Sequence, residues 1–145
     1  MYHELIEELI RDNRWAKIQP PCPEEEIRKA EEIVGTAFPD ELRALLREMN
    51  GDHWLLWPAE EIIRHVKSNR EIYPEYLEPE EYAEKIAPYL CFAGNGCGDC
   101  YCYRILPDGS ADDSAILIWE HELFESRPVA RNMTELITRY YRDEI

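Results

Sequence analysis

The feature that most constrains the fold is a glycine-rich stretch at residues 90–103, with the sequence LCFAGNGCGDCYCY. Its glycines occupy alternate positions between two short apolar segments, and alternate glycines permit positive φ where a backbone reverses. Asp99 can accept hydrogen bonds from the N–H groups of such a turn. The residues that follow alternate with the period of two that is typical of a strand. We therefore expect a hairpin whose turn is formed by Gly96, Gly98 and Asp99.

Nucleotide binding and redox chemistry fit this stretch less well. A phosphate-binding loop follows the pattern G-x-G-x-x-G and leads into a helix, whereas here an aspartate stands in place of the last glycine and a strand follows. A redox dithiol gains its low pKa at a helix N-terminus. The pair Cys97-x-x-Cys100 leads instead into a strand among acidic residues.

The metal alternative stays open for the cysteines of this stretch. A structural zinc site needs four ligands, usually supplied as two pairs. Cys97 and Cys100 form one pair, and Cys91, Cys102 and His121 are the candidates to complete it. Because no second pair is present, we expect no metal and no cofactor, and we expect the cysteines to act as small apolar residues.

The first half of the chain shows helical periodicity. Apolar residues at 5, 6, 9 and 10 predict an opening amphipathic helix, which the proline-rich segment 18–23 ends. Pro23, followed by three glutamates, is typical of a helix start, and Gly35 is a plausible stop. A third helix is predicted to start at residues 38–41 and to end at Asn50-Gly51.

The second half of the chain changes to short apolar segments. Residues 53–57, HWLLW, are predicted to form a strand, residues 60–67 one or two helical turns, and residues 68–87 a loop with a short helix. Three further strands are predicted at residues 89–93, 100–106 and 115–119, with a turn at 107–110, and the near-continuous apolar run of the last indicates a central strand. Asn132 can cap a closing helix, with Glu135 three residues on.

This order of elements predicts an α+β fold. We expect an antiparallel sheet of about four to five strands, with N-terminal helices and a C-terminal helix packed on one face. At 145 residues the chain is expected to form one domain (1–145), in which residues 1–23 are an N-terminal helix and linker and residues 24–145 are the core.

Composition excludes several classes of function. The chain has 31 acidic and 16 basic residues, a formal net charge of −15, and this charge disfavours nucleic acids and anionic membranes as partners while favouring basic proteins. No apolar run is long enough to span a membrane, and the charged N-terminal segment has no secretory character, so a cytoplasmic location is expected. Five cysteines, an odd number, argue against a disulfide framework.

An ordered set of landmarks resembles the SUKH superfamily, named after the fungal Smi/Knr-type regulators of cell-wall assembly (glucan synthesis). These landmarks are Phe38-Pro39 before a helix, Asn50-Gly51 after it, the apolar strand and glycine-aspartate turn at 89–101, and the segment Ile118–Glu122. The resemblance runs from about residue 24 to the C-terminus. It implies an α+β domain without a common catalytic activity, whose bacterial members often bind and neutralise toxins.

The resemblance and the charge together predict a non-enzymatic immunity protein that binds a basic toxin domain. Aromatic anchors among acidic residues are typical of the centre of such an interface. The candidate contact residues are Trp54, Trp57, Tyr73, Tyr76, Glu78, Glu80, Glu81 and Tyr82. For the two tryptophans the alternative is packing in the core on a strand, and for the tyrosines it is a partly exposed loop that packs against the protein.

Two other functions stay open. The first is a regulatory interaction module of the cell-wall assembly type. The second is a metal-dependent hydrolase that uses Asp99, Glu120, His121 and Glu122. We favour the hydrolase least, because neighbouring residues on a strand point to opposite faces and Glu120 and His121 then cannot converge.

Overall fold

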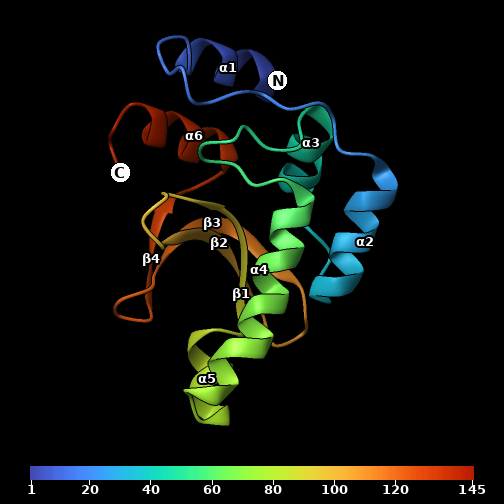
Figure 1. The fold of residues 1–145 in the computed structure, drawn as a ribbon, viewed down its shortest axis with the longest axis vertical. Coiled ribbons are helices and arrows are strands. Elements are labelled where there is room, and N and C mark those ends of the chain that lie inside the picture. Colours follow the sequence, from blue (N-terminus) through green and yellow to red (C-terminus); the bar gives the residue numbers. More distant parts are fainter.

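Four antiparallel strands form a meander in the order β1-β2-β3-β4, in a computed structural model that describes residues 1–145 (Figure 1). The strands are β1 (Tyr89–Gly94), β2 (Cys100–Ile105), β3 (Ala111–Glu120) and β4 (Glu125–Ala130). Each strand pairs with the next through a hairpin connection. β2 and β3 are the two inner strands, which confirms the central position predicted from the apolar run in β3.

Six α-helices and one short 3₁₀ helix surround the sheet, which confirms the α+β class. They are α1 (Tyr2–Leu9), α2 (Glu24–Val34), α3 (Asp40–Glu48), α4 (Ala59–Ile72), η1 (Tyr73–Glu75), α5 (Pro79–Lys85) and α6 (Met133–Tyr141). α1 and α6 lie against each other at one end of the molecule, α4 runs along β1, and α5 lies at the opposite end (Figure 1).

Helix boundaries follow the signals in the sequence. α2 begins directly after Pro23 and ends at Gly35, whose φ of 85° places it in the left-handed region that favours glycine. At the start of α6 the side chain of Asn132 accepts a hydrogen bond from the Glu135 N–H at 2.9 Å. This bond satisfies one of the free N–H groups of the first helical turn and confirms the predicted cap.

The main core lies on the face of the sheet that α1–α4 and α6 cover. A second, smaller core lies on the other face, where the segment from η1 to α5 packs against the sheet. The period of two in β2 explains the division, because Tyr101 and Tyr103 enter the main core while Cys100 and Cys102 enter the small one. The sheet is therefore covered partly on its second face as well, where only one covered face was expected.

The predicted strand at residues 53–57 is wrong. This segment is a turn in which one oxygen of the Asp52 carboxylate accepts the N–H groups of Trp54, Leu55 and Leu56 at 3.0, 2.9 and 2.8 Å. Only one isolated bridge, from Leu56 to Ala93, connects it to the sheet. A side-chain acceptor that binds successive N–H groups competes with strand pairing, and here it prevails.

Two further boundaries differ from the expectation. α4 extends to Ile72, well beyond the one or two helical turns predicted over 60–67. β4, with the sequence ESRPVA, was not predicted, because its polar residues and Pro128 do not form a strand pattern. β4 is an edge strand, the position in a sheet where proline is tolerated.

The fully buried Asp52 connects three separate parts of the chain. Besides the three N–H groups of its own turn, its carboxylate accepts a hydrogen bond from the hydroxyl of Tyr141 at the end of α6. Its main-chain carbonyl accepts the N–H of Lys17, from the linker after α1, at 2.7 Å. A buried carboxylate is tolerated only where hydrogen bonds replace its water, and here four donors do so.

We expect Asp52→Asn to lower the free energy of unfolding by about 1–2 kcal/mol, because a neutral amide oxygen accepts the three N–H groups more weakly than a carboxylate oxygen does. Tyr141→Phe removes one donor and is expected to cost about 1.5 kcal/mol. Urea denaturation followed by circular dichroism measures both values. The exposed Asp113 provides the control, since Asp113→Asn is expected to change stability by less than about 0.5 kcal/mol. Equal effects at positions 52 and 113 would contradict the role given to Asp52.

Candidate functional site

An open groove of about 790 Å³ lies at the end of the molecule where α1 and α6 meet. It is bounded by these helices, the turn that carries Trp54, the glycine turn between β1 and β2, and the ends of β3 and β4. Its aromatic lining residues are Trp54, Tyr101, Tyr140 and Tyr141, and its acidic ones are Asp12, Asp99, Glu120 and Asp143. We call it the α1/α6 groove.

The aromatic wall of the groove is held by ring packing. The rings of Tyr101 and Tyr140 meet edge to face with centroids 6.0 Å apart, and those of Tyr140 and Tyr141 do so at 5.4 Å. Tyr101 is almost completely buried, whereas Trp54 is 45% exposed. The tyrosine rings are therefore ordered by their packing, and Trp54 adds an exposed aromatic side chain to the lining of the groove.

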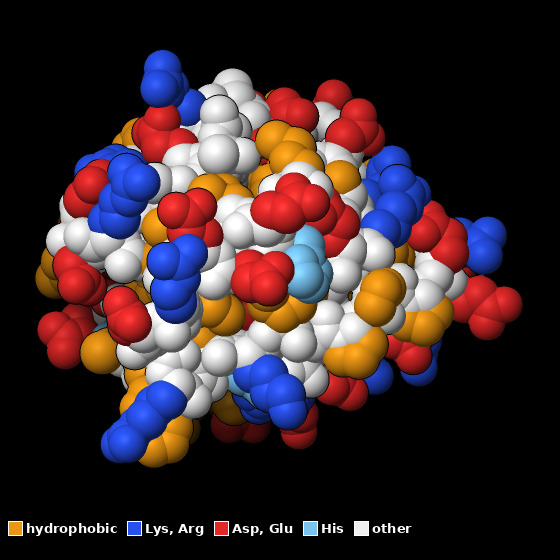
Figure 2. Space-filling view, turned by 90° about the horizontal axis from the view of Figure 1, so that it is seen from above, with side chains coloured by type: hydrophobic (Ala, Val, Ile, Leu, Met, Phe, Trp, Pro, Cys, Tyr) orange, Lys and Arg blue, Asp and Glu red, His pale blue; other side chains and the backbone are white.

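The charge of the groove is mainly negative. Arg127 is its one basic lining residue, and the guanidinium is paired with Glu120, with 3.0 Å between Nε and Oε1. Asp12 and Asp143 form no ion pair. Seen from the α1/α6 end, acidic side chains are spread over the surface between small apolar patches (Figure 2). The groove can therefore attract a cationic partner without first breaking an ion pair.

The glycine turn is joined to the end of β3 by Asp99. One carboxylate oxygen of Asp99 accepts the main-chain N–H of His121 at 3.1 Å and lies 2.7 Å from the ring atom Nδ1. Burial raises the pKa of the Asp99 carboxyl, but the hydrogen bonds from His121 and Asn95 outweigh it, so the net pKa lies below its ordinary value. Within the turn the side chain of Asn95 accepts the main-chain N–H of Cys97, whereas the Asp99 carboxylate accepts the side-chain amide of Asn95 and no main-chain N–H of the turn.

The residues of the hydrolase alternative do not form a ligand set. Asp99 and His121 meet, but the carboxylate of Glu120 binds Arg127, and Glu122 is exposed. No metal-binding group of three residues includes any of these four. The geometry of Asp99 and His121 is that of a hydrogen bond that joins the glycine turn to the end of β3.

The predicted contact residues fall on two separate surfaces. Trp54 lines the α1/α6 groove. The predicted tyrosines and glutamates belong to η1, α5 and the connection between them, at the opposite end of the molecule (Figure 1). We call this second region, residues 73–85, the η1–α5 lobe. The structure therefore does not join the tryptophans and the acidic segment in one patch.

Exposure within the η1–α5 lobe is uneven. Tyr76 is 77% exposed, and the lobe's carboxylates at Glu78, Glu80 and Glu81 are exposed as well. Tyr73 and Tyr82 are half-buried and pack against the small core on the second face of the sheet. Tyr76 is therefore exposed to solvent, whereas Tyr73 and Tyr82 pack the lobe against the sheet.

Trp57 is half-buried and has a supporting position. Its ring contacts the His65 ring, with centroids 4.9 Å apart, and lies over Gly94, where an added Cβ would come within 3.1 Å of it. This packing corresponds to the interior alternative that the sequence left open for the tryptophans.

The four clustered cysteines do not act as one group. Cys97 is exposed in the turn, while the other three are buried. Cys91 and Cys100 converge with His65 of α4, a residue that the sequence analysis did not single out. The hydrogen bond with Cys91 and then burial raise the pKa of the Cys100 thiol far above its ordinary value. This thiol is therefore protonated near neutral pH, unlike the reactive thiolate of a redox dithiol.

Residues 21–139 match the model of the SMI1/KNR4 family (SUKH-1). The chain belongs to this family. The SUKH-1 family has a general role in protein interaction and is generally non-catalytic. No curated protein sequence matches the chain. In this SUKH-1 domain none of the helices has both the length and the apolar composition needed to cross a membrane.

The glycine turn provides a stability test. Gly96 and Gly98 have φ values of 77° and 100°, but a Cβ at Gly98 would lie 2.9 Å from the His121 ring while one at Gly96 would meet nothing within 4 Å. We expect Gly96→Ala to cost about 1–2 kcal/mol for its backbone conformation, and Gly98→Ala to cost roughly 1 kcal/mol more.

A double-mutant cycle with His121→Ala separates the two costs. Urea denaturation is expected to give a coupling of about 1 kcal/mol between positions 98 and 121 and none between 96 and 121. Equal coupling at the two glycines would show that the His121 ring does not restrict the turn.

The tyrosines of the groove predict a loss of stability in alkali. Burial raises the pKa of Tyr101 to about 12 and raises those of Tyr140 and Tyr141 as well. As the pH rises, the tyrosines of the unfolded chain therefore lose their protons first, at about pH 10. The free energy of unfolding keeps its full value below that pH and decreases between about pH 10 and 12. We expect the urea midpoint of unfolding to decrease across this pH range, while phenolate absorbance follows the ionisation of the tyrosines. The decrease is expected to be smaller in Tyr101→Phe. A flat profile would contradict the prediction.

Proposed function

We propose that this chain is an immunity protein, a non-catalytic cytoplasmic domain that binds a basic toxin domain and blocks it. The observation that carries the proposal is the α1/α6 groove, where an exposed tryptophan stands beside two carboxylates that have no ion-pair partner. Family membership supports a role in protein interaction, and the net charge of −15 favours a cationic partner.

Trp54 is the proposed anchor of the interface. Tryptophan side chains that become buried at the centre of an interface are among the residues whose loss costs most affinity. The turn that carries Trp54 is held by the Asp52 carboxylate, so little conformational entropy is lost when a partner covers the ring.

Asp12 and Asp143 are proposed to attract and orient the partner. Exposed charges at the rim of an interface act mainly on the association rate, and their effect is screened by salt. Both carboxylates are exposed, so a cationic side chain of the partner can reach them from solvent.

The η1–α5 lobe is a second proposed contact surface. Tyr76, Glu78, Glu80 and Glu81 project from it into solvent, and Trp57, Tyr73 and Tyr82 act as packing supports. The lobe and the groove lie at opposite ends of the domain, so one small toxin domain is expected to use one of them, and we favour the groove.

Growth rescue tests the proposed function. The open reading frames next to the gene are expressed singly in a test host, and any toxic product is co-expressed with this chain. We expect specific rescue and a stable complex whose association rate falls with added salt. If no neighbour is toxic, or toxicity persists while this chain is well expressed, a regulatory module of the cell-wall assembly type takes its place.

Matched variants locate the interface. We expect Trp54→Ala to raise Kd roughly 30-fold, about 2 kcal/mol, because it removes the anchor. Trp15→Ala is the control, since Trp15 is 62% exposed but does not line the groove. Surface plasmon resonance with the purified toxin domain measures both. If Tyr76→Ala weakens binding while Trp54→Ala does not, the η1–α5 lobe is the contact surface.

A further inference from the structure

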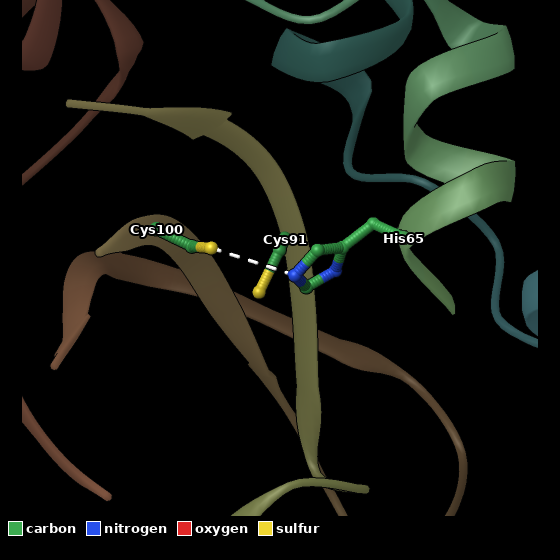
Figure 3. A group of neighbouring side chains, drawn as sticks. All are labelled: His65, Cys91 and Cys100. Atoms are coloured by element: carbon green, nitrogen blue, oxygen red, sulfur yellow. Dashed lines mark hydrogen bonds between the residues drawn. The ribbon is translucent and has the colours of Figure 1, made fainter. Parts of the chain in front are cut away.

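Three metal-binding side chains converge on the second face of the sheet. His65 projects from α4, Cys91 from β1 and Cys100 from β2, and their ligand atoms all lie within 4.8 Å of one another. Figure 3 shows the two sulfur atoms and the imidazole nitrogen pointing toward one another across the gap between helix and sheet. Two strands and a helix, separated by up to 35 residues in sequence, thus supply one group.

The spacing of this group fits a tetrahedral metal. The Sγ atom of Cys100 lies 3.5 Å from Nε2 of His65. Zinc–sulfur bonds of about 2.3 Å and zinc–nitrogen bonds of about 2.0–2.1 Å place two such ligands about 3.5–3.6 Å apart at a tetrahedral angle. Cys91 can therefore complete a set of three by a small shift of its sulfur.

We propose that His65, Cys91 and Cys100 bind a single Zn²⁺ ion. Binding of the ion displaces the protons of the two thiols to solvent. The two thiolates so formed and a neutral imidazole are soft and borderline ligands, which select Zn²⁺ over Mg²⁺ or Ca²⁺. The site is closed, because both cysteines are only 4% exposed. A buried site favours a net charge of zero. Two thiolates neutralise a divalent ion, whereas with Cu⁺ they leave a net negative charge.

The surroundings provide an access path and a candidate fourth ligand. His65 is half-buried, so the ion can enter beside its ring. Cys102 is paired with Cys91 across the two strands and belongs to the same small core. Its sulfur lies 3.7 Å from the Leu117 carbonyl, and a rotation of this side chain toward Cys91 would bring a neutral thiol, which leaves the charge balance unchanged, to the fourth position.

The bound ion would pin α4 to the sheet. α4 contacts β1, and the hydrogen bond between His65 of α4 and Cys100 of β2 is the polar contact that joins this helix to the sheet in this region. Metal that binds only the folded state raises the unfolding temperature, roughly 5–10 °C for a domain of this size at 100-fold excess over Kd. This inference does not rest on the proposed function, because no partner is involved.

Zinc titration of the full-length reduced protein tests the site. We expect one equivalent of Zn²⁺ to bind in competition with a chromophoric chelator. Co²⁺ is expected to give thiolate charge-transfer bands and the visible bands of a tetrahedral ion. Cys91→Ser, Cys100→Ser and His65→Gln are each expected to weaken binding by more than the roughly 10–100-fold that loss of an outer-shell partner costs.

Two control variants test the alternative ligand set of the C-x-x-C pair. Cys97→Ser and His121→Gln lie outside the group and are expected to bind Zn²⁺ as the parent chain does. If they lose zinc while Cys91→Ser keeps it, the proposal is overturned. Failure of the parent chain to bind one equivalent overturns it as well.

X-ray absorption on the zinc-loaded parent chain keeps the test independent of how the cysteine variants fold. We expect at least two sulfur ligands and one imidazole around zinc. A shell of oxygen and nitrogen alone would show that the ion binds elsewhere.

Discussion

The buried carboxylate of Asp52 is the interaction on which the arrangement of this domain most depends. It accepts hydrogen bonds from three successive N–H groups and from the Tyr141 hydroxyl, and no basic side chain neutralises it. The turn after α3, the end of α6 and the linker after α1 meet at this residue. Each of these three segments contributes to the α1/α6 groove or its border. The shape of the groove therefore depends on the hydrogen-bonded carboxylate of Asp52.

The glycine turn forms the opposite border by a related device. Asp99 connects it to the end of β3 through His121, and the lack of a side chain at Gly98 lets the turn approach the imidazole ring closely. Both borders thus rely on an acidic side chain that accepts main-chain N–H groups. An acidic groove of this kind retains its form while its remaining carboxylates, at Asp12 and Asp143, stay available to a partner.

Elements with strong local signals could be predicted from the sequence, and elements that depend on distant contacts could not. Pro23, Gly35 and Asn132 mark helix ends by local chemistry, and the structure places those ends as predicted. The apolar residues of HWLLW suggest a strand, but the Asp52 carboxylate binds their N–H groups and holds the segment as a turn. The aspartate just before the apolar residues was the signal in the sequence for this turn. β4 has no strand pattern of its own, since it forms by pairing with β3.

The candidate sites show the same limit. The C-x-x-C spacing made Cys97 a candidate ligand, but the buried group consists of Cys91, Cys100 and His65. These residues meet because β1 and β2 are paired and α4 lies beside them. Only the pairing of strands and the path of a helix 26 residues upstream of Cys91 bring these atoms together. No spacing rule contains that information.

Trp57 connects the two regions of interest. Its ring lies over Gly94, where the glycine turn begins, and against the imidazole of His65. It also directly follows the turn that presents Trp54. A shift of His65 would therefore displace the Trp57 ring and, through it, the start of the glycine turn at Gly94, since a close-packed ring cannot move without displacing its neighbours. The proposed zinc group and the proposed contact surface therefore share one packed support, the Trp57 ring.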